Sequence, residues 1–170
     1  MHVTSSRSTP SAVRTAPDVL AMAGALHEWL ATAERLRAAR RNGTAGRLLM
    51  GKNLAVLQPA GATDKSTLHR AATDLGVRAA QLSLGEPLPA AVDLAQVARM
   101  LGRLYDAIDA SRLPQDAAAE LGKHASVPVY RDFGGDGNTL PPLATQLCTQ
   151  ASDGDAMRFL MQALLLRTMA

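Results

Sequence analysis

The middle of the chain alternates short apolar runs with segments of helical periodicity. This alternation is typical of a parallel sheet covered by helices. The apolar runs are short enough to be buried strands, and the segments between them place apolar residues three and four positions apart. The sequence therefore predicts an α/β fold: an open, mostly parallel sheet of about four strands, flanked by helices in three layers. The expected strands cover residues 53–58, 77–83, 105–109 and 127–130, and the expected helices between them cover residues 64–75, 92–103 and 114–124.

Helical patterns also flank this central region. Residues 18–36 repeat apolar side chains at helical spacing, and a basic segment follows that ends in Asn-Gly at residues 42–43, as helix ends commonly do. The same periodicity predicts a last helix over residues 155–169, whose apolar face needs a surface to pack on. Residues 1–17 are rich in Ser, Thr and Pro and lack an apolar run, so they are predicted to be a disordered leader.

Composition narrows the classes of partner. One Trp, two Tyr and two Phe are too few for a surface that stacks on unpaired bases, so no nucleic acid is expected to bind. A single cysteine cannot form an intramolecular disulfide, and no Cys/His spacing resembles a zinc site. We therefore expect no metal or other cofactor, and a reducing, cytoplasmic location. No apolar stretch approaches the ~18 residues of a membrane-spanning helix, so no membrane partner is expected.

Three segments carry a more specific pattern. They are GKNLAVLQP at residues 51–59, VARMLGRLYDAI at residues 97–108 and ELGKHASVPVY at residues 120–130. In order and spacing they resemble the first domain of the ornithine and aspartate carbamoyltransferases, and the similarity extends over about residues 17–150. The resemblance implies a carbamoyl-phosphate-binding-like domain over residues 18–150, with residues 151–170 forming a C-terminal helix that packs back on it. The family transfers a carbamoyl group from carbamoyl phosphate to an amino group.

The phosphate-binding positions of that family have changed in this sequence. A small dianion needs backbone N–H groups at a helix N-terminus and arginines that bind it through two hydrogen bonds. Thr63 stands where the resemblance implies the first arginine, Lys65 is only a point-charge substitute for the second, and Asp64 adds a negative charge. An ordinary helix cap at Thr63 or Asp64 is the alternative interpretation. A remnant substrate-binding site would consist of Thr63, Asp64, Lys65, Ser66, Ser111 and Arg112, where Ser111 aligns with a further family arginine.

Other family elements are also altered or missing. The segment at residues 138–143, which aligns with the family's His-Pro-x-Gln motif, contains neither histidine nor glutamine. The loop at residues 85–93, which aligns with the one that reaches a neighbouring subunit, contains no cation. The family's amino-acid-binding domain would need about 150 residues, whereas 20 residues follow Gln150. The sequence therefore indicates a truncated and degenerate relative, with no catalytic residues expected.

Three functions are compatible with these features. The first is a non-catalytic carbamoyltransferase-like protein that acts as an oligomerisation or regulatory interaction module. Its expected partner is a further copy of the chain, as a trimer by resemblance, or an intact carbamoyltransferase. The second is a divergent carbamoyltransferase component completed by another chain, with Lys65 and Arg112 contacting phosphate. The third is a sensor that binds a small anion or amino acid where the strands end.

Overall fold

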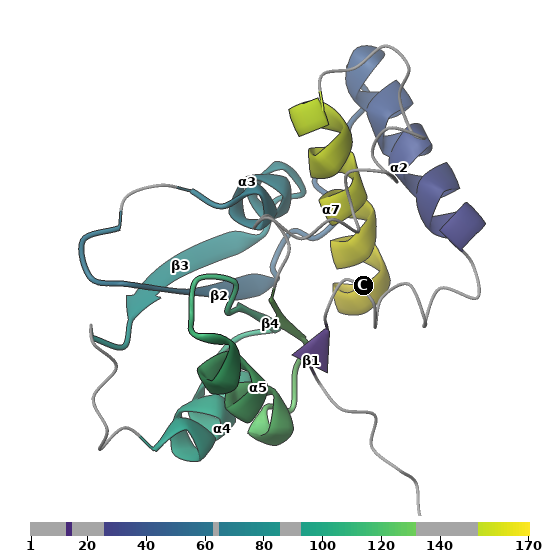
Figure 1. The fold of residues 1–170 in the computed structure, drawn as a ribbon. Coiled ribbons are helices and arrows are strands. Elements are labelled where there is room, and N and C mark those ends of the chain that lie inside the picture. Colours follow the sequence, from purple (N-terminus) through teal and green to yellow (C-terminus); the bar gives the residue numbers. More distant parts are fainter. Residues whose placement is uncertain (1–12, 15–25, 63–64, 86–92, 132–152) are drawn as a thin grey trace, which may run out of the picture.

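The strands form a single parallel sheet. The computed structural model describes residues 13–14, 26–62, 65–85, 93–131 and 153–170 (Figure 1). Within these residues the strand order is β1-β5-β4-β2-β3, and every neighbouring pair is parallel. The predicted α/β fold with an open parallel sheet is confirmed. The strands are β1 (Val13–Arg14), β2 (Asn53–Gln58), β3 (Arg78–Ser83), β4 (Ala107–Asp109) and β5 (Val129–Tyr130).

Strand β2 shows how the helices form layers on both sides of this sheet. Its side chains point alternately to opposite faces, so Leu54 and Val56 enter one apolar cluster while Ala55 and Leu57 enter another. Helices α2, α3 and α7 contribute to the first cluster, and α4 and α5 to the second (Figure 1). The predicted three layers are therefore present. The helices are α2 (Leu26–Arg41), α3 (Thr67–Asp74), α4 (Leu94–Leu104), α5 (Gln115–His124) and α7 (Asp153–Met169).

Helix α7 completes the core on one face of the sheet. It packs against both α2 and α3, so nearly all of its middle turns are buried, including Leu160, Met161, Leu164 and Leu165. The indole Nε1–H of Trp29 on α2 donates to the carbonyl oxygen of Leu160 at 3.0 Å. Burying one leucine side chain contributes about 1.5–3 kcal/mol relative to exposure, so this helix supplies a large part of the folding free energy.

Strand β1 lies inside the segment predicted to be a disordered leader. Val13 and Arg14 pair with Val129 and Tyr130 of β5, so the prediction does not hold at these two residues. The remaining residues of 1–17 lie outside the described residues. Two residues are too few to show an alternating pattern, and parallel pairing uses backbone groups that every residue except proline provides. This edge strand therefore left no signal in the sequence.

Two negative findings concern the described ranges alone. None of the helices there is both long and apolar enough to cross a membrane. The same ranges contain no group of three His, Cys, Asp or Glu side chains placed to hold a metal ion.

Candidate functional site

The candidate site lies where strands β2 and β4 end. Because the strands are parallel, their carboxyl ends meet at one edge of the sheet, which is where open α/β folds bind ligands. Gln58 is the last residue of β2 and Asp109 is the last residue of β4, with Asp109 opposite Val56 in the register. Ser66, which precedes helix α3, contacts Asp109, so the start of this helix lies at the same edge.

Asp109 connects the two segments from which a phosphate site was predicted. The hydroxyl of Ser66 donates to Oδ2 of Asp109 at 2.9 Å. The backbone N–H and the hydroxyl of Ser111 both donate to Oδ1, at 3.1 Å and 2.5 Å. Asp109 is 1% exposed, so its carboxylate accepts three hydrogen bonds in a site that water scarcely reaches. The sequence analysis identified Asp109 only as the end of a strand. An acidic residue at the end of an apolar strand is a signal that could have marked it as a site residue.

Ser66 also begins helix α3. Its backbone is extended, with φ −60° and ψ 160°, and its hydroxyl oxygen accepts a hydrogen bond from the backbone N–H of His69 at 3.0 Å. Ser66 is therefore the N-cap, and the helix begins at Thr67. The alternative interpretation placed an ordinary helix cap at Thr63 or Asp64, and this position was wrong by two or three residues. The hydroxyl of Ser66 instead accepts the hydrogen bond from the first turn of the helix.

Two buried polar side chains lie beside this cap. Gln58 is 7% exposed and His69 is 6% exposed. The Gln58 amide donates to the carbonyl oxygen of Ala62 at 2.8 Å, which holds the loop between β2 and α3. Burial, aided by the positive charge of Lys65, lowers the pKa of His69, and the opposing attraction of Asp109 is smaller. Within the described part of the chain, Gln58 Oε1 and His69 Nδ1 have no hydrogen-bond partner.

The structure places four of the six predicted site residues. Ser66 and Ser111 come together on Asp109, while Lys65 is exposed just before the cap and Arg112 is half-buried just after Ser111. Thr63 and Asp64 lie outside the described residues, as do residues 86–92 and 138–143, on which the other family elements were expected. The observed arrangement presents one buried carboxylate, two hydroxyl groups and two cations at its margin.

Comparison with solved structures places this architecture among known proteins. Ornithine carbamoyltransferase from Pyrococcus furiosus matches with a TM-score of 0.58 and 27% identity over 72% of this chain and 40% of its own. The enzyme from Thermus thermophilus matches with a TM-score of 0.53 and 28% identity, over 72% of this chain and 42% of its own. This chain has a carbamoyltransferase-like domain fold. The catalytic subunit of M. jannaschii aspartate transcarbamoylase shares that fold at 18% identity, with a TM-score of 0.55 and coverage of 72% and 41%.

The carbamoyltransferase-like fold confirms the resemblance inferred from the three sequence segments. The chain spans about 40% of the length of these solved relatives, which corresponds to a single domain. No protein-family model matches the sequence. The chain therefore shares the fold of these carbamoyltransferases at sequence identities of 18–28%.

Proposed function

We propose that this carbamoyltransferase-like chain is non-catalytic and serves as an oligomerisation or regulatory interaction module. The observation that supports the first part is the buried carboxylate of Asp109. It already accepts the hydroxyl hydrogen bonds of Ser66 and Ser111. A bound phosphate group would compete for these donors and would bring its own negative charge next to Asp109.

The size of this conflict follows from the geometry. A phosphate oxygen that replaced Asp109 as acceptor for the Ser66 hydroxyl would lie about 5 Å from the carboxylate, given ordinary hydrogen-bond lengths. At an effective dielectric constant of about 20, two unit negative charges at this separation repel each other by about 3 kcal/mol. This repulsion corresponds to a loss of affinity of roughly a hundredfold. Thr63 and Ser111 offer no guanidinium to compensate, because they stand where the family resemblance implies arginine.

Calorimetric titration with carbamoyl phosphate tests the non-catalytic part of the proposal. We expect no binding, or a dissociation constant weaker than about 0.1 mM, since each missing charged hydrogen bond removes about 1.5–3 kcal/mol. An intact ornithine carbamoyltransferase titrated under the same conditions is the positive control. Binding tighter than 0.1 mM would overturn the proposal and favour a divergent enzyme component.

The exposed face of helix α4 supports the interaction role. Met100 and Leu104 lie one helical turn apart and are 52% and 63% exposed. With Arg99, Arg103 and His124 they line an open hollow of about 780 Å³. Neighbouring exposed apolar side chains on a folded protein are typical of contact surfaces. We propose that α4 contributes to contacts with further copies of the chain or with an intact carbamoyltransferase.

Sedimentation velocity tests the interaction role. The chain is measured alone and together with an intact ornithine carbamoyltransferase, and we expect an assembly larger than one chain in at least one of the two samples. Met100→Lys should shift this assembly towards the monomer. Gln115→Lys adds the same charge to an exposed position of α5 and should leave the assembly unchanged. A chain that stays monomeric in both samples would contradict the interaction role.

A further inference from the structure

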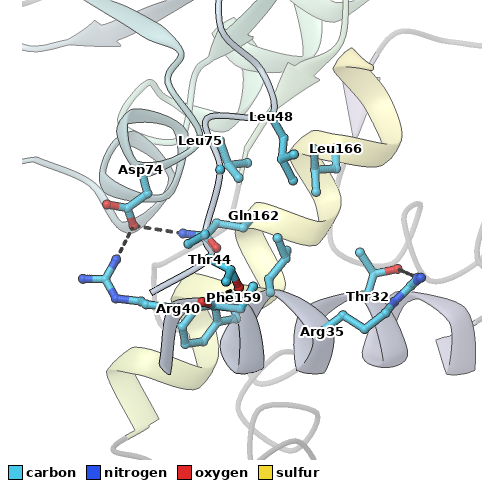
Figure 2. A pocket seen from close by; sticks show the side chains of 14 residues that line it. Thr32, Arg35, Arg40, Thr44, Leu48, Asp74, Leu75, Phe159, Gln162 and Leu166 are labelled. Atoms are coloured by element: carbon cyan, nitrogen blue, oxygen red, sulfur yellow. Dashed lines mark hydrogen bonds and ion pairs between the residues drawn. The ribbon is translucent and has the colours of Figure 1, made fainter. Parts of the chain in front are cut away.

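A cavity lies between helices α2 and α7, away from the edge of the sheet that contains Asp109. It has a volume of about 410 Å³, is open to solvent on one side, and is also lined by the loop after α2 and by the end of α3 (Figure 2). This volume is within the range of small-molecule pockets, about 300–1,000 Å³. Its walls are mostly apolar and include Leu36, Ala39, Leu48, Leu75, Phe159 and Leu166.

Small residues keep this cavity open. Ala39 on α2 and Ala45 and Gly46 in the following loop line it with little side-chain volume. Leu48 lines the same space and is nevertheless 58% exposed, so a large apolar side chain borders the cavity without being covered by the fold. Figure 2 shows Leu48, Leu75 and Leu166 on the same side of the cavity. An apolar ligand group placed there would bury surface that is now accessible to water.

Charged side chains concentrate along the cavity. Asp74 accepts hydrogen bonds from Nε and Nη2 of Arg158, the latter at 2.5 Å, and from the Gln162 amide at 2.9 Å. The guanidinium of Arg40 is 3.8 Å from Asp74, and the Arg40 side chain is 53% exposed (Figure 2). Arg158 already binds both oxygens of Asp74, so the contact of Arg40 with this carboxylate is the longer of the two.

Arg35 is a second arginine of α2 that lines the cavity. Its Nη2 donates to the hydroxyl of Thr32 at 3.1 Å, so it lies along the rim of the cavity and is not withdrawn into an ion pair with Asp74. Among the described residues that line the cavity, Arg35 and Arg40 are therefore accompanied by one carboxylate, that of Asp74, which Arg158 already binds. This excess of positive charge favours an anion, while the apolar walls favour a hydrocarbon group.

We propose that this cavity binds a small anionic amphiphile, a carboxylate with an apolar tail of about eight to ten carbon atoms. Arg40 binds the carboxylate, and the tail lies between Leu36, Leu48 and Leu166. The site is separate from the edge of the sheet that contains Asp109, so it does not depend on whether the chain binds carbamoyl phosphate.

Calorimetric titration of the full chain with decanoate, below the concentration at which it forms micelles, tests this site. We expect saturable binding with one ligand per chain. Octanoate should bind more than tenfold more weakly than decanoate, because each buried methylene changes affinity by about fourfold. Decanol, which has the same tail without the charge, should bind at least fivefold more weakly than decanoate.

Two arginine variants distinguish binding in the cavity from non-specific attraction of the anion to positive charge. Arg40→Gln should weaken decanoate binding by about five- to tenfold, because it removes an exposed charged hydrogen-bond partner. Arg41→Gln removes the same charge from the next residue of α2, which does not line the cavity, and should leave the affinity unchanged. Both positions are exposed, so both variants should fold. Absence of saturable decanoate binding, equal affinity for decanol, or equal effects of the two variants would each overturn the proposal.

Discussion

Replacing Ser66 with alanine tests whether Asp109 organises the candidate site. The hydroxyl of Ser66 has two partners: it accepts from the backbone N–H of His69 at 3.0 Å and donates to Asp109 at 2.9 Å. Losing an N-cap costs about 1 kcal/mol. Losing a hydrogen bond to a buried carboxylate costs about 1.5–3 kcal/mol, because the Asp109 side chain is left with one donor fewer. Ser66→Ala should therefore lower the free energy of unfolding by about 3 kcal/mol.

Asp93 provides a matched control for this prediction. It caps helix α4 by accepting from the backbone N–H of Gln96 at 3.0 Å, it is exposed, and no second hydrogen bond of its side chain is seen in the described ranges. Asp93→Ala should therefore cost only the capping contribution of about 1 kcal/mol. The difference of about 2 kcal/mol between the two variants is the contribution of the bond to Asp109.

Urea unfolding followed by circular dichroism measures both variants. The dependence of stability on urea should stay the same, so that shifts of the midpoint report stability alone. In thermal unfolding, Ser66→Ala should lower the midpoint by about 6–12 °C, at 2–4 °C for each kcal/mol in a chain of this size. If Ser66→Ala costs no more than Asp93→Ala, the bond to Asp109 contributes nothing and the reasoning about the site fails.

Four further predictions concern other parts of the fold. The pKa of His69 is lowered in the folded chain, so the unfolded chain takes up a proton at higher pH and stability should fall as the pH drops below about 6.5. His69→Gln should weaken this dependence of stability on pH, measured by urea unfolding at pH 5–7. An unchanged pH dependence would show that His69 is not its source. Arg158→Gln should cost about 1–3 kcal/mol in urea unfolding, since it leaves the carboxylate of Asp74 with weaker partners, and a cost below 0.5 kcal/mol would contradict this. Leu164→Ala should cost about 2–5 kcal/mol in the same assay, because Leu164 is 1% exposed in the core; a neutral result would show that α7 does not pack as described. Gly102→Ala would place Cβ 2.6 Å from the hydroxyl oxygen of Ser126 and 3.2 Å from its backbone nitrogen, so it should lower the melting temperature by several degrees; an unchanged melting temperature would show that Ser126 moves aside without cost.

The layered fold could be predicted because its signals are local. Each strand is a short apolar run, whereas each helix repeats its apolar residues at helical spacing, so length and spacing together distinguish the two. The run Leu54 to Leu57 illustrates this, since continuous apolar character predicts a strand covered on both faces, and the structure buries all four residues. The family resemblance also followed from sequence, because its segments keep order and spacing.

The candidate site could be predicted only in part. Sequence alignment brought attention to Ser66 and Ser111, but their relation depends on the register between β2 and β4, which joins residues about fifty positions apart. Asp109 was missed as a partner for the same reason: an acidic residue at a strand end has no defined environment until the neighbouring strand and helix α3 are in place. The position of the helix cap differed by two or three residues because several hydroxyl and carboxylate side chains precede α3, and each is able to cap.

The amino-acid sequence alone determined the class of fold and the approximate position of most elements, since these depend on residue type and on spacing along the chain. Only the tertiary structure decided that Val13 and Arg14 extend the sheet and that Asp109 accepts the hydrogen bonds of the hydroxyl groups at the site. It also decided that α2 and α7 leave a cavity beside Arg40. These features depend on contacts between distant segments. Such contacts form through backbone hydrogen bonds and side-chain packing that no local pattern in the sequence records.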